Sequence, residues 1–166
     1  MTSCLAFDTA TVTGVAFGRS GDRPKSWSVD LGKVDWPVRF SKTLRMVRHY
    51  ATEMKPDLIA VEAFVGGPKA NPNLVGLVCC VLGEADRMGI RTVSYYPASI
   101  RSHFLGGIKG KGPIKQQVFA KCRLLGWAPP SLDAADALVL WDYALSLESR
   151  SHQIASVGGL FAAGQK

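Results

Sequence analysis

The sequence has few acidic residues, few histidines and no paired cysteines. Its 166 residues include 13 Asp and Glu against 20 Lys and Arg, for a formal net charge of +7, and three histidines. None of the four cysteines stands at a metal-ligand spacing from another cysteine or a histidine, so a zinc site is not expected. No Gly-X-Y or heptad repeat is present, which excludes collagen-like and coiled-coil folds. With 47% hydrophobic residues, the chain should form a globular mixed α/β domain.

Long hydrophobic runs are also absent. The longest begins at Leu74 and ends at Leu82, far short of the roughly 20 residues that span a membrane. No basic region precedes the apolar stretch near the N-terminus, as a secretory signal would require. We therefore expect a cytoplasmic protein with reduced cysteines and no membrane contact.

The spacing of apolar residues predicts alternating strands and helices. Three strands of an antiparallel meander come first, then a helix, a strand, a helix, a strand and two helices. The expected ranges are strands at 4–9, 14–18, 25–30, 57–62 and 92–96, and helices at 40–51, 73–88, 114–125 and 132–147. This order predicts a mixed sheet with helices on its faces. We expect one domain over residues 1–148 and a flexible tail over 149–166, which is rich in Ser, Gly and Ala.

Four acidic residues stand where these elements end or begin. Asp8 and Glu62 end two predicted central strands, at the edge where α/β sheets build their sites. Asp133 and Asp136 lie three apart at the start of the last helix and so share one face, although acids at a helix start also offset its dipole. If the four converge, their repulsion requires cations, and carboxylate oxygens suit Mg²⁺ or Mn²⁺. A pair of such ions can catalyse phosphodiester hydrolysis.

The excess positive charge is local. Between Asp86 and Asp133 lie eight basic residues and no acidic ones. Such a segment favours binding to nucleic acid phosphates, with a solvated surface as the alternative. The loop at 106–113 could bring backbone N–H groups and lysines to phosphates, but it lacks the G-K-[ST] ending of a nucleotide-binding P-loop.

The helix predicted at 73–88 is more apolar than one buried face requires. Apolar residues surround nearly its whole circumference between Leu74 and Leu82. The surplus indicates a partner subunit, with a helix buried entirely inside one chain as the alternative.

Several of these segments together resemble the RuvC-type Holliday junction resolvases, which are metal-dependent endonucleases of the ribonuclease H-like superfamily. The matching segments run in family order through residue 143 and are LAFDT at 5–9 with Gly14, LIAVE at 58–62, Tyr96-Pro97 with Ile100-Arg101, GKG at 110–112 with KQQV at 115–118, and DAADAL at 133–138. The resemblance implies a ribonuclease H-like fold, with a mixed five-stranded sheet of three antiparallel and two parallel strands flanked by helices.

The resemblance also implies a function. The chain would be a homodimeric endonuclease that resolves branched DNA by paired nicks, with its interface around residues 74–82. It would use Mg²⁺, replaceable by Mn²⁺, with two ions per site. The implied catalytic residues are Asp8, Glu62, Asp133, Asp136 and Lys115, the four acids being metal ligands. The implied DNA-binding residues are Arg101, Lys109, Lys111, Lys115, Phe64 and Lys69.

This chain departs from the family pattern beside the second acid. Ala63 follows Glu62 where many members carry Gln, and the aromatic residue Phe64 stands one position early. The loop at 66–72 also differs from the common bacterial form, which suggests a divergent, phage-type member that acts in the host cytoplasm.

A second hypothesis keeps the ribonuclease H-like scaffold without nuclease activity. The segment DTAT at 8–11 also resembles the first phosphate loop of the actin-like ATPase group. The chain would then be a non-catalytic or nucleotide-binding partner protein. This hypothesis does not explain the pair Asp133 and Asp136 or the basic segment.

Overall fold

A five-stranded sheet forms the centre of the protein. The computed structural model describes residues 1–67, 70–106, 112–149 and 152. The strands are β1 (Ser3–Asp8), β2 (Val12–Arg19), β3 (Lys25–Asp30), β4 (Leu58–Glu62) and β5 (Arg91–Tyr95), in the spatial order β3-β2-β1-β4-β5. β1, β2 and β3 form an antiparallel meander, while β4 and β5 run parallel to β1. The expected mixed sheet is confirmed.

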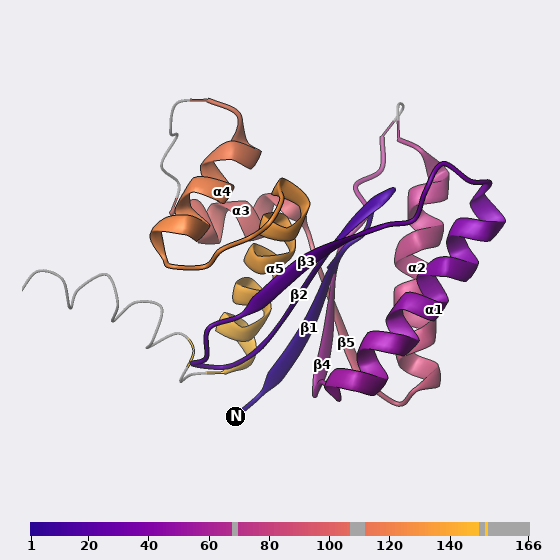
Figure 1. Ribbon diagram of the computed structural model, residues 1–166, viewed down its shortest axis with the longest axis horizontal. Helices are drawn as coiled ribbons and strands as arrows, with labels where there is room; N and C mark the ends of the chain where they lie inside the picture. Colours follow the sequence, from indigo (N-terminus) through magenta and orange to yellow (C-terminus); the bar gives the residue numbers. More distant parts are fainter. Residues whose placement is uncertain (68–69, 107–111, 150–151, 153–166) are drawn as a thin grey trace, which may run out of the picture.

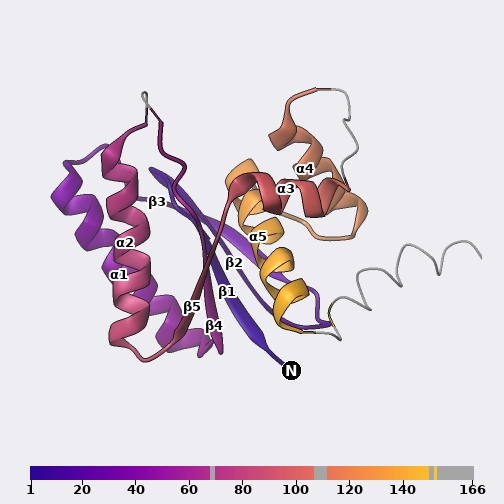
Figure 2. The ribbon, with the colours of Figure 1, turned by 180° about the vertical axis from the view of Figure 1, so that it is seen from behind.

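Helices cover both faces of the sheet (Figure 1). One layer consists of α1 (Trp36–Met54) and α2 (Pro72–Arg87), and the other of α3 (Pro97–Leu105), α4 (Ile114–Leu124) and α5 (Leu132–Glu148). Figure 2 shows the same two layers from behind. Because side chains alternate along a strand, Leu5 and Phe7 of β1 enter the core under α1 and α2, whereas Cys4 and Ala6 enter the core under α5.

The final helix is buried along most of its length. Small residues on α5 let it pack closely against β1 and β2, and Trp141 is fully buried, with Nε1 donating a hydrogen bond to the Gly18 carbonyl at 3.1 Å. At its start, the Ser131 side chain accepts a hydrogen bond from the Ala134 backbone N–H. These contacts fix the N-terminus of α5 at one edge of the sheet.

The structure adds one helix, α3, to the predicted element order, which had no element between the strand at 92–96 and the helix at 114–125. The helix has nine residues, and only Ile100 and Phe104 among them are buried. Two anchors in so short a segment give too little periodicity to indicate a helix, and Pro97 at its start is compatible with the first turn.

The chain after α5 was predicted to be a flexible tail from residue 149 to residue 166. Most of it, residues 150–151 and 153–166, lies outside the described residues, so there the prediction is untested. His152 is described, and it is 5% exposed. Among the described helices, none is long and apolar enough to cross a membrane.

Candidate active site

The four predicted carboxylates meet at one edge of the sheet. Asp8 and Glu62 end the adjacent parallel strands β1 and β4. Each lies two residues beyond an alanine, Ala6 or Ala60, whose side chain is in the core under α5, so both carboxylates face that helix. Asp133 and Asp136 occupy the first turns of α5 at this same edge.

Electrostatics shows how closely the carboxylates are grouped. Burial raises the pKa of Asp8 to about 8, and the negative charges of Glu62, Asp136 and Asp133 add to this effect. Burial likewise raises the pKa of Glu62, opposed by the nearby guanidinium of Arg101. Carboxylates that repel one another in this way need a cation to stay ionised together.

Lys115 supplies one positive charge. It lies in the first turn of α4, and its Nζ is 2.9 Å from Asp136 Oδ2 and 3.3 Å from Asp133 Oδ1. The structure therefore places Lys115 with the predicted acids, and brings Arg101 of α3 close enough to influence Glu62.

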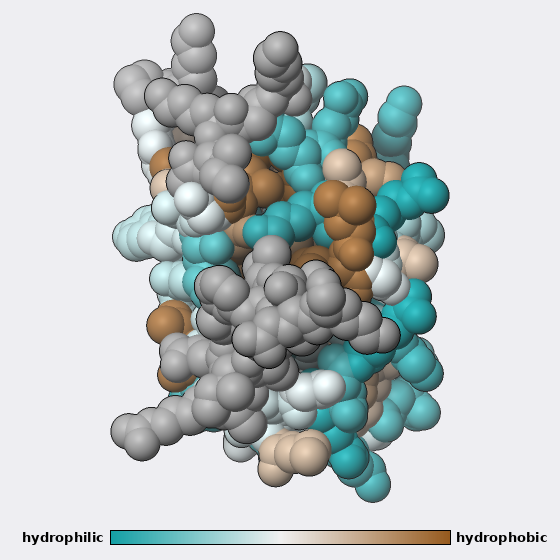
Figure 3. Space-filling view, turned by 90° about the vertical axis from the view of Figure 1, so that its left-hand side faces the viewer, coloured by the Kyte–Doolittle hydropathy of each residue, from teal (hydrophilic) through white to brown (hydrophobic). Residues whose placement is uncertain are grey.

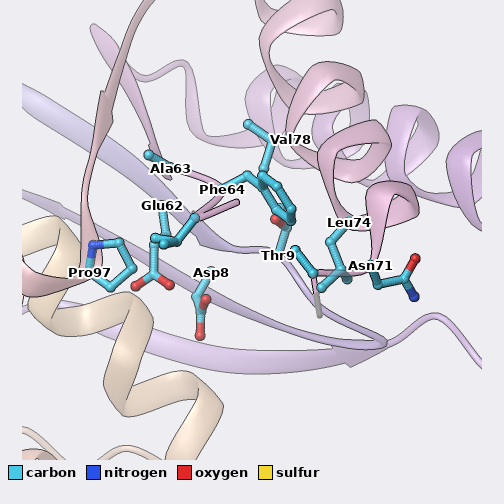
Figure 4. A pocket seen from close by; sticks show the side chains of 11 residues that line it. Asp8, Thr9, Glu62, Ala63, Phe64, Asn71, Leu74, Val78 and Pro97 are labelled. Atoms are coloured by element: carbon cyan, nitrogen blue, oxygen red, sulfur yellow. The ribbon is translucent and has the colours of Figure 1, made fainter. Parts of the chain in front are cut away.

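A cleft of about 380 Å³ opens beside Asp8 and Glu62. In Figure 4 the two carboxylates lie side by side, with Pro97 next to Glu62. The ring of Phe64 lies on the other side of the cleft, near Leu74 and Val78 of α2. One half of the cleft is thus acidic and the other half is apolar.

Not every predicted DNA-binding residue is placed. Lys69, Lys109 and Lys111 lie outside the described residues. Two other members of the basic segment form ion pairs at 2.7 Å, Arg87 with Glu84 and Arg91 with Glu148. Figure 3 looks onto the layer of α3, α4 and α5, where described side chains are largely hydrophilic with separate apolar areas between them.

Sequence reasoning gave no structural role to two residues that support the site. Gly14 pairs with Asp8 across β1 and β2, and a Cβ there would lie 2.0 Å from the Asp133 carbonyl oxygen. Only the absence of a side chain lets α5 approach β2 this closely. The local sequence gives no signal for this contact, because it joins distant segments.

The second of these residues is Asp142 of α5. Asp142 is 5% exposed. Its Oδ1 lies 2.8 Å from His152 Nε2, and its Oδ2 lies 3.5 Å from His103 Nε2. Burial opposes ionisation, but these contacts prevail and lower the pKa of Asp142. The cluster ties α3 to α5. A lone acid within the apolar stretch of α5 was the available sequence signal.

The chemistry of the donor set fits a hard divalent cation. Carboxylate oxygens from β1, β4 and α5 face one another, and hard cations such as Mg²⁺ bind through oxygen. Within the described residues, however, no three His, Cys, Asp or Glu side chains already stand at metal-ligand spacing. The carboxylates would have to rearrange to hold an ion.

Known proteins resemble this chain in structure but not detectably in sequence. No family model matches it, and a search of curated proteins finds no match. RuvC from Thermus thermophilus has a TM-score of 0.70 and 19% identity, over 89% of this chain and 96% of that one. The structure of the same protein in complex with a Holliday junction substrate has a TM-score of 0.70 and 18% identity, over 91% of this chain and 98% of that one.

Two other resolvases extend the comparison. The yeast mitochondrial Holliday junction resolvase Ydc2 has a TM-score of 0.67 and 12% identity, over 96% of this chain and 84% of that one. The fowlpox virus resolvase, solved with Holliday junction DNA, has a TM-score of 0.56 and 16% identity, over 90% of this chain and 100% of that one. The chain therefore has the ribonuclease H-like fold of these junction-resolving proteins.

Proposed function

We propose that this protein is a metal-dependent endonuclease that resolves Holliday junctions or related branched DNA by paired nicks. The observation that carries the proposal is the meeting of Asp8, Glu62, Asp133 and Asp136 at one sheet edge, beside a cleft and two basic side chains. The fold shared with solved junction resolvases supports branched DNA as the substrate.

The four carboxylates would hold two Mg²⁺ ions, which Mn²⁺ could replace. When bound, such a pair polarises the attacking water and stabilises the oxygen that leaves. Asp8 and Glu62 contribute oxygens from the rigid strand ends, and Asp133 and Asp136 complete the set from α5. Water oxygen forms the new bond to phosphorus, one bridging P–O bond breaks, the water proton passes to solvent, and the departing oxygen takes a proton from solvent to become a hydroxyl group.

Basic and aromatic side chains around the acids would orient the DNA. Arg101 and Lys115 lie beside the carboxylates and would contact phosphates near the bond that is cut. Lys69, Lys109 and Lys111 would add further phosphate contacts. Phe64 forms the apolar wall of the cleft and offers a ring on which an unpaired base can stack.

Paired nicks would require two active sites, and α2 offers a surface for a homodimer. Val75 is 36% exposed and Cys79 is exposed, while Leu82 is only partly buried. These three residues recur at helical spacing along α2. A second copy packed on this stripe would cover apolar surface that the single chain leaves in solvent.

The deciding experiment compares Asp8→Asn with the matched variant Asp22→Asn. Asp22 is exposed, in the turn between β2 and β3. On a labelled four-way junction with Mg²⁺, Asp8→Asn should cut about 1000-fold more slowly or worse, since a catalytic metal contributes several kcal/mol. Junction binding should persist, and Asp22→Asn should match the unmodified protein.

The choice of DNA and the metal complete the test. Linear duplex should be cut far less than the four-way junction, and chelation of the metal should abolish cutting. Full cleavage by Asp8→Asn would disprove the mechanism. A protein stabilised by ATP but indifferent to branched DNA would instead support the actin-like alternative.

A further inference from the structure

Lys115 already occupies the oxygens that a metal would need. Its ammonium group lies 2.9 Å from Asp136 Oδ2 and 3.3 Å from Asp133 Oδ1. Both residues are proposed metal ligands, and in the described residues no three acids stand at ligand spacing. One cationic side chain thus holds the two α5 carboxylates while the set of oxygen donors remains open.

The position of Lys115 suits a contact that can be exchanged. Asp136 is 7% exposed at its side chain, whereas Lys115 is 47% exposed, so the ammonium reaches a buried acid from the solvent side. Burial lowers the pKa of Lys115, but the hydrogen bonds and negative charges of the surrounding acids together raise it, so the ammonium stays charged. The lysine side chain has a flexible four-carbon stem, so its ammonium group can move away from the carboxylates without any movement of α4.

We propose that Lys115 is a resident counter-ion of the metal-free site, which a divalent cation must displace before it can bind Asp133 and Asp136. The displaced ammonium is then free to contact a DNA phosphate. This inference rests on the proposed metal site. It assigns Lys115 a role opposed to metal binding in the absence of DNA, in addition to the role with phosphate.

The physical argument is competition for shared lone pairs. Without Lys115, Asp133 and Asp136 lose a partner and repel Asp8 and Glu62 more strongly, so the metal-free state becomes less favourable. A divalent cation then binds without first breaking two ion pairs. Lys115→Met should therefore bind metal roughly tenfold more tightly, within the 5-fold to 150-fold range typical of coupled ligands.

Calorimetric titration with Ca²⁺ and with Mn²⁺, without DNA, tests this directly. Lys115→Met should bind each metal ion about tenfold more tightly than the unmodified protein does. Lys115→Arg should bind it with nearly the affinity of the unmodified protein. Arg123→Met is the matched control, because it removes the same charge from an exposed position on α4. That variant should change affinity less than twofold.

A second measurement uses the unmodified protein and so does not depend on the folding of a variant. Acetylation of Lys115 by an amine-reactive ester, followed by mass spectrometry, should be slow without metal and at least threefold faster with saturating Ca²⁺. Acetylation of Lys25, on β3, should not change.

The outcomes separate this inference from the proposed function. If the unmodified protein binds metal, Asp8→Asn does not, and Lys115→Met binds no more tightly, the counter-ion role is wrong and the nuclease site stands. If neither the unmodified protein nor Lys115→Met binds metal, both proposals are wrong. A Lys115 acetylation rate that Ca²⁺ leaves unchanged would also overturn the counter-ion role.

Discussion

Asp8 is the residue whose chemistry depends most on its neighbours. It ends β1 at the point where β4 and α5 bring three other acids, and burial removes water that would stabilise its charge. The same crowding that makes Asp8 a good metal ligand makes its ionised form unfavourable in the metal-free protein. Residues selected for a site are often costly to stability in this way.

The pH dependence of stability should reveal this cost. Burial and neighbouring acids raise the pKa of Asp8 from 3.8 to about 8 in the folded protein. Between these values the folded state keeps a proton that the unfolded state has released, so the free energy of unfolding falls as pH rises. With a chelator present, Asp8→Asn should lose this decline and be several kcal/mol more stable than the unmodified protein at pH 8, because each unit of raised pKa costs about 1.4 kcal/mol.

Urea denaturation at intervals from about pH 4 to about pH 8.5 would measure the effect. Asp22→Asn serves as the control, because that exposed side chain is remote from the four acids, and its stability profile should follow the unmodified protein. An equal decline with pH in Asp8→Asn would show that another group causes it.

At the scale of elements, the contact between α5 and β2 sets the geometry of the site. A Cβ at Gly14 would lie 2.0 Å from the Asp133 carbonyl oxygen and 3.2 Å from the Ala137 Cβ. Backbone atoms cannot tolerate such an approach, so α5 would have to move outward. Asp133 and Asp136 would then withdraw from Asp8 and Glu62.

Gly14→Ala should therefore impair both stability and cleavage. We expect the free energy of unfolding to fall by about 1–3 kcal/mol from overpacking. Displacement of about 1 Å at the acids should slow single-turnover cleavage of the junction about 100-fold. Gly83→Ala is the control, because its Cβ meets nothing within 4 Å, and it should be as stable as the unmodified protein or slightly more so. Normal cleavage by Gly14→Ala would show that the close packing is dispensable.

The same elements show what sequence could and could not predict. The strands were predictable because apolar runs ending in Asp8 and Glu62 fit the interior of a sheet, and strand ends meet at one edge. The start of α5 was predictable from the spacing of Asp133 and Asp136. α3 was not, since its two buried anchors give almost no periodicity.

The individual side-chain contacts between distant segments could not be derived from composition and periodicity. The pairing of Lys115 with Asp133 and Asp136 joins α4 to α5, and nothing in either segment specifies the other. The need for glycine at position 14 appears only when α5 lies across β2. Phe64 was expected near DNA, and the structure adds that its ring forms the wall of a cleft.

For the whole molecule, the position of α2 relates the proposed dimer to the proposed paired nicks. The helix begins at the edge of the sheet where Glu62 ends β4, and Leu74 and Val78 of α2 line the cleft. A two-fold axis parallel to α2 and next to it would place both clefts on the same side of the dimer. Two strands of one junction could then be cut by the two subunits.

The exposed cysteine of α2 allows a direct test of this arrangement. Cys79 is exposed, whereas Cys4 and Cys122 are buried in the core. A short bismaleimide should cross-link the unmodified protein into covalent dimers, and Cys79→Ser should reduce this yield at least about fivefold, because nearby paired thiols react at a high effective concentration. Because the neighbouring Cys80 is partly exposed, equal cross-linking of the double variant Cys79→Ser/Cys80→Ser would place the interface elsewhere.

Charge placed on the α2 stripe should separate assembly from chemistry. Leu82 packs only partly against the core of the monomer, whereas in the dimer Leu82→Glu would bury a carboxylate against apolar surface, so we expect dissociation, with circular dichroism to check that the fold is retained. Leu124→Glu is the matched control, because Leu124 is 87% exposed on α4 in the opposite helix layer, and this variant should remain dimeric.

Sedimentation velocity measures the assembly, and a supercoiled plasmid carrying an extruded cruciform measures the nicks. Leu82→Glu should yield singly nicked circles where the unmodified protein yields linear DNA, since each monomer cuts alone. A Leu82→Glu variant that stays dimeric and still linearises the plasmid would exclude α2 as the interface.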